Sequence, residues 1–280
     1  MPRHPEEEAR TALDAAGNLP DEELDLAAVA LQFARIDAPT ADWHGAARLL
    51  SAIAQAAHTA AQESAAEAPE QRRAVLARVL HGRFGLTGDA ETYDDLANAN
   101  LIRVLERRRG LPVALGILWL HAAAAADWAA HGVDFPGHFL VALPGVRSQA
   151  VVDVFGGGAT LTPPELRALL KRFEGPEAEL RPGVLRPLGR REVLLRLQNN
   201  IRLRRLRAGD MVGALACTED ALRLAPCHAG LWREAGLMNR RLDRIGAAIA
   251  CLDRALALEP EGEAARRIRA AADELRQRLN

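Results

Sequence analysis

The sequence predicts an α+β protein that is predominantly α-helical. Hydrophobic residues make up 49 % of its 280 residues, but aromatic residues only 4 %. Alanine and leucine supply most of the apolar content, which favours closely packed helices over a β-rich sandwich. Strand-like segments are confined to one central stretch, and a periodic helical pattern follows it. We therefore expect a small antiparallel sheet within an otherwise helical chain.

Three helices are predicted before residue 90. After a frayed acidic start, the first begins at Asp21, whose side chain can cap it. The second follows Thr40 and carries apolar residues at helical spacing. Pro69 opens the third, which ends at Phe84–Gly88. We expect residues 1–90 to form a helical region that packs on the domain that follows.

Residues 91–188 are expected to form a central domain that contains the sheet. Val133–Phe135 and His138–Leu143 have β-type composition, and Gln149–Phe155 is their antiparallel partner across a turn that contains proline and glycine. Thr162–Glu165 then has the pattern of a capping box with proline at the first helical position. A further helix should begin there.

Residues 189–280 contain an internal repeat. Ala214 and Ala221 recur as Ala248 and Ala255, 34 residues later (248 − 214 and 255 − 221). This period is that of the tetratricopeptide repeat, a pair of antiparallel helices. The sequence therefore predicts two such repeats followed by a last helix.

Some side chains of the repeats have an expected role. Trp232 and Asn239 are expected on the protein-binding surface of the second copy. Cys217 and Cys251 are also 34 residues apart (251 − 217), so we interpret them as small core residues rather than a redox pair.

The sequence predicts neither an export signal nor a segment able to cross a bilayer. Met1–Glu8 lacks the apolar core of a signal peptide. The longest apolar run, Leu111–Ala126, is short of the roughly 20 residues that a spanning helix needs. The three cysteines, Cys217, Cys227 and Cys251, form no Cys-x-x-Cys pair. We expect a cytoplasmic protein without membrane contact, disulfide, metal ion or cofactor.

The net charge argues against a general binder of polyanions, although charge is unevenly distributed. The formal net charge is −1 at pH 7. Arg181–Arg207 holds nine arginines and one acid, Glu192, whereas residues 1–25 hold eight acids and two arginines. These segments could neutralise each other, or the basic one could contact an acidic partner.

Three motifs in the central domain point to a known family. Asn98–Pro112 reads Asn-Ala-Asn-Leu-Ile-Arg-Val-Leu-Glu-Arg-Arg-Arg-Gly-Leu-Pro, Gly137–Val141 reads Gly-His-Phe-Leu-Val, and Asp153–Gly157 reads Asp-Val-Phe-Gly-Gly. Together they resemble the transglutaminase-like core of the bacterial SirB-type proteins, which is followed by tetratricopeptide repeats. The resemblance implies a papain-like fold in which a nucleophile opens a helix, a histidine follows on a strand, and an aspartate on the next strand orients that histidine.

His138 and Asp153 take the positions of the histidine and the aspartate. They are 15 residues apart (153 − 138), and on two antiparallel strands their side chains can lie on the same face. Two other interpretations stay open. His138 could be a core histidine bonded to a backbone carbonyl, and Asp153 could hold the turn at Gly156–Gly158 through its backbone amides.

The nucleophile that the resemblance implies is missing. The chemistry needs a thiol at a helix N-terminus, where the dipole and an imidazole lower its pKa, but no cysteine precedes Cys217. The Gly-x-Cys pattern of active transglutaminases places the cysteine at Pro112, and alignment with Gly-Ile-Pro-Ile-Ser-Leu of SirB-type relatives puts Ala114 at their serine. Neither residue can attack a carbonyl, so we predict that cysteine-type catalysis is absent.

Three polar residues near this helix are possible groove residues: Asn98, Arg108 and Arg109. We interpret Asn98 as a helix cap rather than a substrate contact. The arginine run at 107–109 ends a predicted helix, where the dipole favours cations, so part of it is ordinary helix termination.

The observations support three hypotheses. The first is a pseudoenzyme that acts as a protein-binding or regulatory scaffold, with the repeats as a second surface. The second is a hydrolase in which His138, oriented by Asp153, activates water without a covalent intermediate. The third is a nucleic-acid-associated regulator using Arg181–Arg207. It is disfavoured because no aromatic residue lies between Phe173 and Trp232 to stack on bases.

Overall fold

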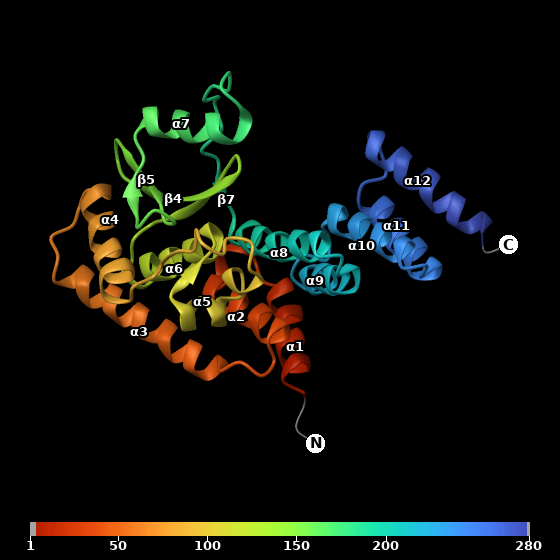
Figure 1. The fold of residues 1–280 in the computed structure, drawn as a ribbon, viewed down its shortest axis with the longest axis horizontal. Coiled ribbons are helices and arrows are strands. Elements are labelled where there is room, and N and C mark those ends of the chain that lie inside the picture. Colours follow the sequence, from red (N-terminus) through yellow and green to blue (C-terminus); the bar gives the residue numbers. More distant parts are fainter. Residues whose placement is uncertain (1–3, 279–280) are drawn as a thin grey trace. The chain divides into compact units, whose positions relative to one another are not determined.

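The computed structural model describes residues 4–278, and these form two compact units (Figure 1). The first unit combines the residues up to Ala9 with Pro20–Leu197. The second combines Arg10–Leu19 with the chain from Gln198 onward. Helices predominate in both, and the first unit also holds a small antiparallel sheet. The predicted fold class is confirmed, while the domain boundaries placed at residues 90 and 188 stay predictions.

The N-terminal part of the chain is helical. Its elements are α1 (Pro5–Gly17), α2 (Leu26–Asp37), α3 (Trp43–Gln62), α4 (Pro69–Ala77) and a π-helical turn (Arg78–Arg83) that continues α4. The second and third predicted helices correspond to α3 and α4. The acidic start is not frayed, because its residues from Pro5 onward form α1.

The cap of the first predicted helix lies elsewhere. Asp25 caps α2 by accepting hydrogen bonds from the Ala27 and Ala28 amides, each at 3.0 Å. Asp21 instead accepts from the amides of Arg190 and Arg191, at 2.7 and 2.8 Å, where α8 (Arg190–Arg207) begins. Several acids in this segment suit a cap equally well, and only the distant contact with α8 distinguishes them.

The sheet has five antiparallel strands in the order β6-β5-β4-β3-β7. Their bounds are His131–Phe135 (β3), His138–Pro144 (β4), Gln149–Asp153 (β5), Ala159–Thr160 (β6) and Pro187–Leu188 (β7). Phe135 pairs with His138 across the tight turn at Pro136 and Gly137. Gly137 has a φ of +69°, and a Cβ there would lie 2.3 Å from the Phe173 ring, so only glycine suits the turn.

Helices cover both faces of the sheet (Figure 1). On one face α7 (Pro163–Glu174) places Leu166 and Leu170 against Phe135 and Leu140. On the other face lies α6 (Pro112–Ala125), where a Cβ on Gly116 would be 2.2 Å from the Phe139 ring. Coverage on both sides explains why β4 is a continuous apolar run rather than an alternating one.

The apolar run at Leu111–Ala126 is a buried helix. Eleven of the fourteen residues of α6 are buried, as expected for a helix that is hydrophobic on all sides and lies in a core. Within the described residues, no helix combines the length and the apolarity needed to cross a membrane. Just before α6, α5 (Leu101–Arg107) and two short paired strands, β1 (Thr87–Gly88) and β2 (Arg109–Gly110), complete the first unit.

The second unit is entirely helical in its described part. Besides the last turns of α8 it contains α9 (Met211–Leu224), α10 (Ala229–Arg241), α11 (Ile245–Leu258) and α12 (Gly262–Gln277). The repeated alanines lie in its core, with Ala214, Ala248 and Ala255 fully buried. The end of α1 belongs to this unit, because Arg10 pairs with Asp220 at 2.9 Å.

Candidate functional site at His138 and Asp153

His138 opens β4 and Asp153 ends β5, and their side chains are hydrogen-bonded. The distance from His138 Nε2 to Asp153 Oδ1 is 3.0 Å, and the exposed fractions of the two side chains are 10 % and 23 %. In the register of the two strands Val141 pairs with Val152. The two side chains are therefore diagonal neighbours on one face of the sheet, the geometry that the spacing predicts.

Asp153 also holds the turn that follows it. The same Oδ1 atom accepts hydrogen bonds from the amides of Phe155 and Gly156, at 3.0 and 3.2 Å. The pairing with His138 and the turn interpretation are thus both correct, and they share one atom. Burial raises the pKa of Asp153, but the hydrogen bond and charge of His138 and the two amides outweigh burial and bring the pKa below its ordinary value.

The state of the imidazole follows from its partner. Because the Asp153 carboxylate is ionised at neutral pH and only accepts, His138 Nε2 carries the proton in this hydrogen bond. In the neutral ring Nδ1 is then an acceptor. No residue from 4 to 278 makes a hydrogen bond to Nδ1. Nδ1 of His138 is therefore a basic nitrogen without a hydrogen-bond partner among the described residues.

Aromatic rings surround the pair. The Phe155 ring is edge-on to the imidazole and the Phe173 ring is nearly parallel to it, each with centroids 6.3 Å apart. Tyr93 is edge-on to Phe155 at 5.8 Å. Tyr93 is 40 % exposed and Phe173 48 % exposed, so the imidazole lies beside a partly open aromatic surface.

Arg196, from α8, fixes the strand that carries His138. Its Nη2 donates to the His138 carbonyl at 2.7 Å, and it forms an ion pair with Asp134. Burial lowers the pKa of Arg196, and a nearby Tyr93 opposes that shift. This role could not be predicted from the sequence, because Arg196 is 58 residues from His138 and is one of many arginines in the basic segment.

The helix that should carry the nucleophile is in place, but its reactive residue is absent. Pro112 is the first residue of α6, and Pro112 and Ala114 are both buried. Proline has no amide proton, and the alanine side chain is inert. Three of the pockets in the described chain have volumes of ≈ 520, ≈ 600 and ≈ 640 Å³, and neither His138 nor Pro112 lines any of these three.

The three predicted groove residues have structural contacts. Asn98 is fully buried and lies in a 3-10 turn, and the cap of α5 is Asn100, which accepts from the Arg103 amide at 3.2 Å. The cap interpretation of Asn98 is therefore wrong, because the 3-10 turn delays the start of the helix. Arg108 ends α5 with a φ of +59° and donates to a backbone carbonyl, while Arg109 pairs with an exposed carboxylate.

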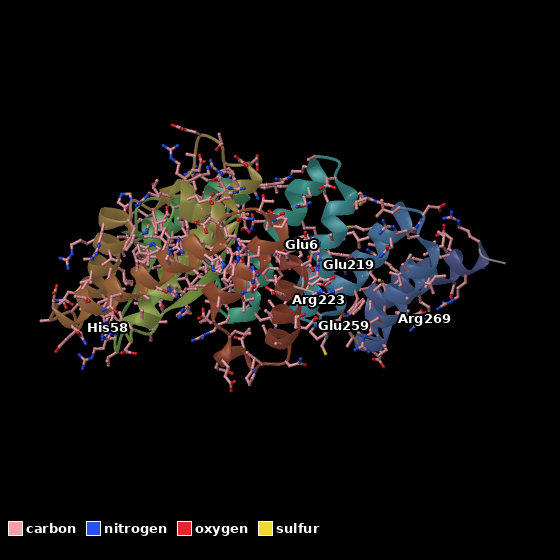
Figure 2. The ribbon with its side chains drawn as sticks, turned by 90° about the horizontal axis from the view of Figure 1, so that it is seen from below. Glu6, His58, Glu219, Arg223, Glu259 and Arg269 are labelled. Carbon is pink, nitrogen blue, oxygen red and sulfur yellow. The ribbon has the colours of Figure 1, made fainter. Side chains whose placement is uncertain are left out.

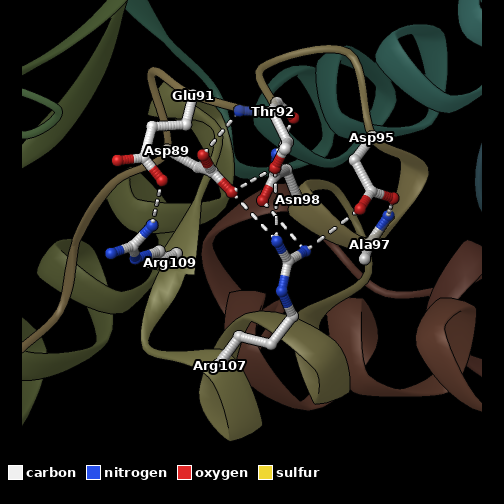
Figure 3. A network of polar contacts seen from close by, with 8 residues as sticks. All are labelled: Asp89, Glu91, Thr92, Asp95, Ala97, Asn98, Arg107 and Arg109. Atoms are coloured by element: carbon white, nitrogen blue, oxygen red, sulfur yellow. Dashed lines mark hydrogen bonds and ion pairs between the residues drawn. The ribbon is translucent and has the colours of Figure 1, made fainter.

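Asn98 belongs to a polar network around Asp89, shown in Figure 3. Asp89 is 2 % exposed and lies 2.9 Å from Arg107. The Thr92 amide and hydroxyl donate to it at 2.9 and 2.7 Å. These two donors lower the pKa of Asp89, and Asn98 and Arg107 lower it further against the effect of burial. The network holds in place the loop that contains Tyr93, whose ring contacts Phe155 beside His138.

Asn239 does not lie on the surface of the repeats, where it was expected. Asn239 is 2 % exposed and donates to the Ala235 carbonyl at 3.0 Å, so it is a core residue rather than a surface one. Its polar side chain is satisfied by its own helix, which composition alone cannot show. Trp232 is partly buried against both apolar clusters of the unit, and its indole N–H donates to the Pro226 carbonyl at 2.8 Å.

Several arginines of the basic segment have partners within their own units. Arg186 pairs with Glu192 at 2.9 Å, and Arg205 with Asp210 at 3.0 Å. Arg202 forms an ion pair with Glu234, and Arg191 lies 3.8 Å from Asp21 of the acidic N-terminal segment. Local neutralisation removes much of the field that a nucleic acid would need.

Comparison with known proteins supports the assignment made from the motifs. The model of the transglutaminase-like superfamily matches residues 46–199, more than half of the chain. The chain belongs to this superfamily. A tetratricopeptide repeat model matches residues 201–273. The predicted combination of a transglutaminase-like domain and tetratricopeptide repeats is thus confirmed.

The chain is similar to bacterial UPF0162 proteins and, over a shorter stretch, to a mammalian protein. A UPF0162 protein of Xylella fastidiosa (strain Temecula1) is 30 % identical over 243 residues, 86 % of each chain. A UPF0162 protein of Pseudomonas aeruginosa is 31 % identical over 202 residues, 72 % of this chain and 73 % of its own. Mouse F-box only protein 21 is 29 % identical over 100 residues, 33 % of this chain and 16 % of its own. No solved structure matches.

Substitutions of the pair are expected to differ in cost. His138→Ala removes one hydrogen bond to a largely buried carboxylate and should lower the free energy of unfolding by about 1 kcal/mol. Asp153→Ala removes the acceptor of three hydrogen bonds and should cost about 2–3 kcal/mol. Asp153→Asn keeps an oxygen acceptor and should cost less than either. Urea denaturation measures the order, and a His138→Ala variant as stable as the wild type would contradict the structural pairing.

Proposed function

We propose that this chain is a non-catalytic member of its superfamily that binds a protein partner in the cytoplasm as a regulatory scaffold. The observation that carries the proposal is the start of α6, where Pro112 and Ala114 occupy the nucleophile positions and are buried. A histidine and an aspartate without a nucleophile cannot form an acyl-enzyme. Tetratricopeptide repeats commonly mediate protein interactions, which supports a second binding surface in the other unit.

The His138 surface has features suited to non-covalent recognition. An oriented imidazole offers the acceptor Nδ1, the exposed Phe173 ring lies beside it, and the exposed Tyr93 ring contacts Phe155 next to it. A hydrogen-bond acceptor beside aromatic surface can bind a donor group and an apolar group of one partner segment. The Asp153 bond holds the acceptor in a fixed position, which reduces the entropy lost on binding.

Catalysis is tested with the full-length protein. Wild type and His138→Ala are incubated with glutamine-containing peptides plus an amine, and with activated esters, and product is followed by mass spectrometry. We expect the same background rate for both proteins, because neither has a nucleophile at the helix start. Turnover by the wild type that disappears in His138→Ala would contradict the proposal.

A general-base hydrolase is the second candidate, and the unused Nδ1 of His138 favours it. Asp153 orients the ring as a base requires, so a water activated at Nδ1 is chemically reasonable. This candidate predicts hydrolysis that falls in Asp153→Asn. Amine transfer would stay absent, which distinguishes water activation from acyl transfer.

A further inference from the structure

A pocket of ≈ 520 Å³ lies in the second unit, within the size range of ligand sites. It is formed by the end of α1 and by parts of α9, α10 and α11. The residues that matter to its chemistry are Glu219, Leu222, Pro226, Trp232, Ala235 and Cys251.

The end of α1 is a fixed wall of this pocket. A Cβ on Gly17 would lie 2.2 Å from the Arg223 carbonyl oxygen, so the two helices touch there. Asp14 accepts two hydrogen bonds from Arg223 Nη1, at 2.8 and 3.0 Å. Arg10 pairs with Asp220 one turn away along α1. The pocket is therefore built by contacts that lock α1 onto α9.

The charges around the pocket leave one carboxylate without a close partner. Arg223 is engaged by Asp14 and by Asp220, which lies 3.5 Å away. Glu219 is exposed, and no residue between 4 and 278 makes a hydrogen bond or an ion pair with its carboxylate. Glu219 and Arg223 lie one turn apart on α9, as Figure 2 shows.

The surroundings of Glu219 favour the arrival of a cation. Glu219 is exposed as a whole residue, but partial desolvation of its carboxylate and the neighbouring Asp220 raise its pKa, although Arg244, Arg223 and Arg10 oppose the shift. Burial and the charge of Glu219 likewise raise the pKa of the Cys251 thiol. A positive group beside Glu219 would stabilise its ionised form, so the two would bind each other favourably.

Part of the pocket wall is apolar. Leu222 and Ala235 are buried, and Pro226 and the Trp232 indole lie beside them. Because the indole N–H is bonded to the Pro226 carbonyl, the ring can offer a ligand only its carbon edge and its π face. Such a surface suits an aliphatic stem and, at its end, a cation over the ring.

We propose that this pocket receives an arginine side chain of a partner protein, with the guanidinium at Glu219 and the methylene stem along Leu222 and Trp232. Arginine combines the required stem with a planar cation that pairs with carboxylates and stacks on aromatic rings. The protein origin of the arginine rests on the proposed scaffold function. The preference for the cation itself rests only on the pocket.

The test uses the four tryptophans of the full-length protein as reporters. Indole N–H signals are recorded by ¹⁵N NMR and Trp232 is assigned with Trp232→Phe. Nα-acetyl-arginine methylamide should shift the Trp232 signal with a Kd on the order of millimolar, as expected for a ligand of this size. The neutral citrulline analogue should leave it unchanged. The other three indole signals come from the first unit and should not move with either probe.

Matched variants locate the interaction. Glu219→Gln should weaken arginine amide binding about fivefold to tenfold, because it removes one partly desolvated ion pair. Glu259→Gln makes the same charge change in the same unit outside the pocket lining and should have no effect. Equal binding of the arginine and citrulline probes, or an unchanged Kd in Glu219→Gln, would overturn the proposal.

Two further results separate the pocket from the scaffold function. A peptide with one central arginine should bind more tightly than the amide if the arginine comes from a protein. Tighter binding of the amide would overturn the protein origin. Turnover that depends on His138 would contradict the scaffold function. It would not contradict arginine binding in the pocket, which the Trp232 signal measures separately.

Discussion

Replacing Asp89 by alanine is expected to lower the free energy of unfolding of the first unit by about 3 kcal/mol, because it breaks a hydrogen-bonded ion pair with one partner buried. In the variant the Thr92 amide, the Thr92 hydroxyl and the Arg107 guanidinium each lose the carboxylate that accepts their hydrogen bond. Urea denaturation followed by tryptophan fluorescence in a Trp232→Phe background reports this unit alone, since the other three tryptophans belong to it.

The Asp89 effect should depend on pH in a defined direction. The folded-state pKa of Asp89 lies below the ordinary value of 3.8, so its stabilising contribution is complete above 3.8 and is lost as the pH falls through the folded value. The difference between wild type and Asp89→Ala should therefore shrink in acid. Glu91→Ala is the control, because the 80 % exposed Glu91 side chain should contribute at most about 0.5 kcal/mol. Equal losses in the two variants would refute a stabilising role for the Asp89 network.

Gly116→Ala is expected to destabilise the first unit by about 1–3 kcal/mol, although alanine is the better helix former. The added Cβ would lie 2.2 Å from a carbon of the Phe139 ring, which is only 1 % exposed and cannot move freely. The same denaturation experiment measures the loss. Because α6 packs on β4 at this point, the His138 imidazole signal should also shift in NMR spectra.

Gly246→Ala provides the matched control for the glycine substitution. Gly246 lies in the first turn of α11 with no atom within 4 Å of an added Cβ. The second unit should therefore gain a few tenths of a kcal/mol from helix propensity. Destabilisation by Gly246→Ala, or stabilisation by Gly116→Ala, would contradict the close-packing argument.

Local patterns predicted those features that depend on neighbouring residues. Pro112 and Pro163 mark helix starts as expected, and the 34-residue spacing placed the repeat cores correctly. The diagonal contact of His138 and Asp153 follows from strand geometry alone. These features depend on backbone periodicity, which sequence records directly.

Features set by distant contacts could not be predicted in this way. Asn98 and Asn100 have equal capping preference. Asn100 is the cap of α5 only because Asn98 lies in a 3-10 turn. The pairing of Asp89 with Arg107 and the hold of Arg196 on the His138 strand join elements far apart in the chain. Tertiary packing selects among locally equivalent residues, so these roles appear only in the folded chain.

Labelling of the wild type with electrophilic acyl donors, followed by intact-mass analysis and peptide mapping, tests the non-catalytic assignment most directly. Cys217, Cys227 and Cys251 all lie in the repeat unit, and Cys227 is the exposed one. We predict adducts at these cysteines, with Cys227 first, and at the amine of the partly exposed Lys171, with the same pattern in His138→Ala. An acyl adduct within residues 46–199 that disappears in His138→Ala would show a working nucleophile in the transglutaminase-like domain and would contradict the assignment.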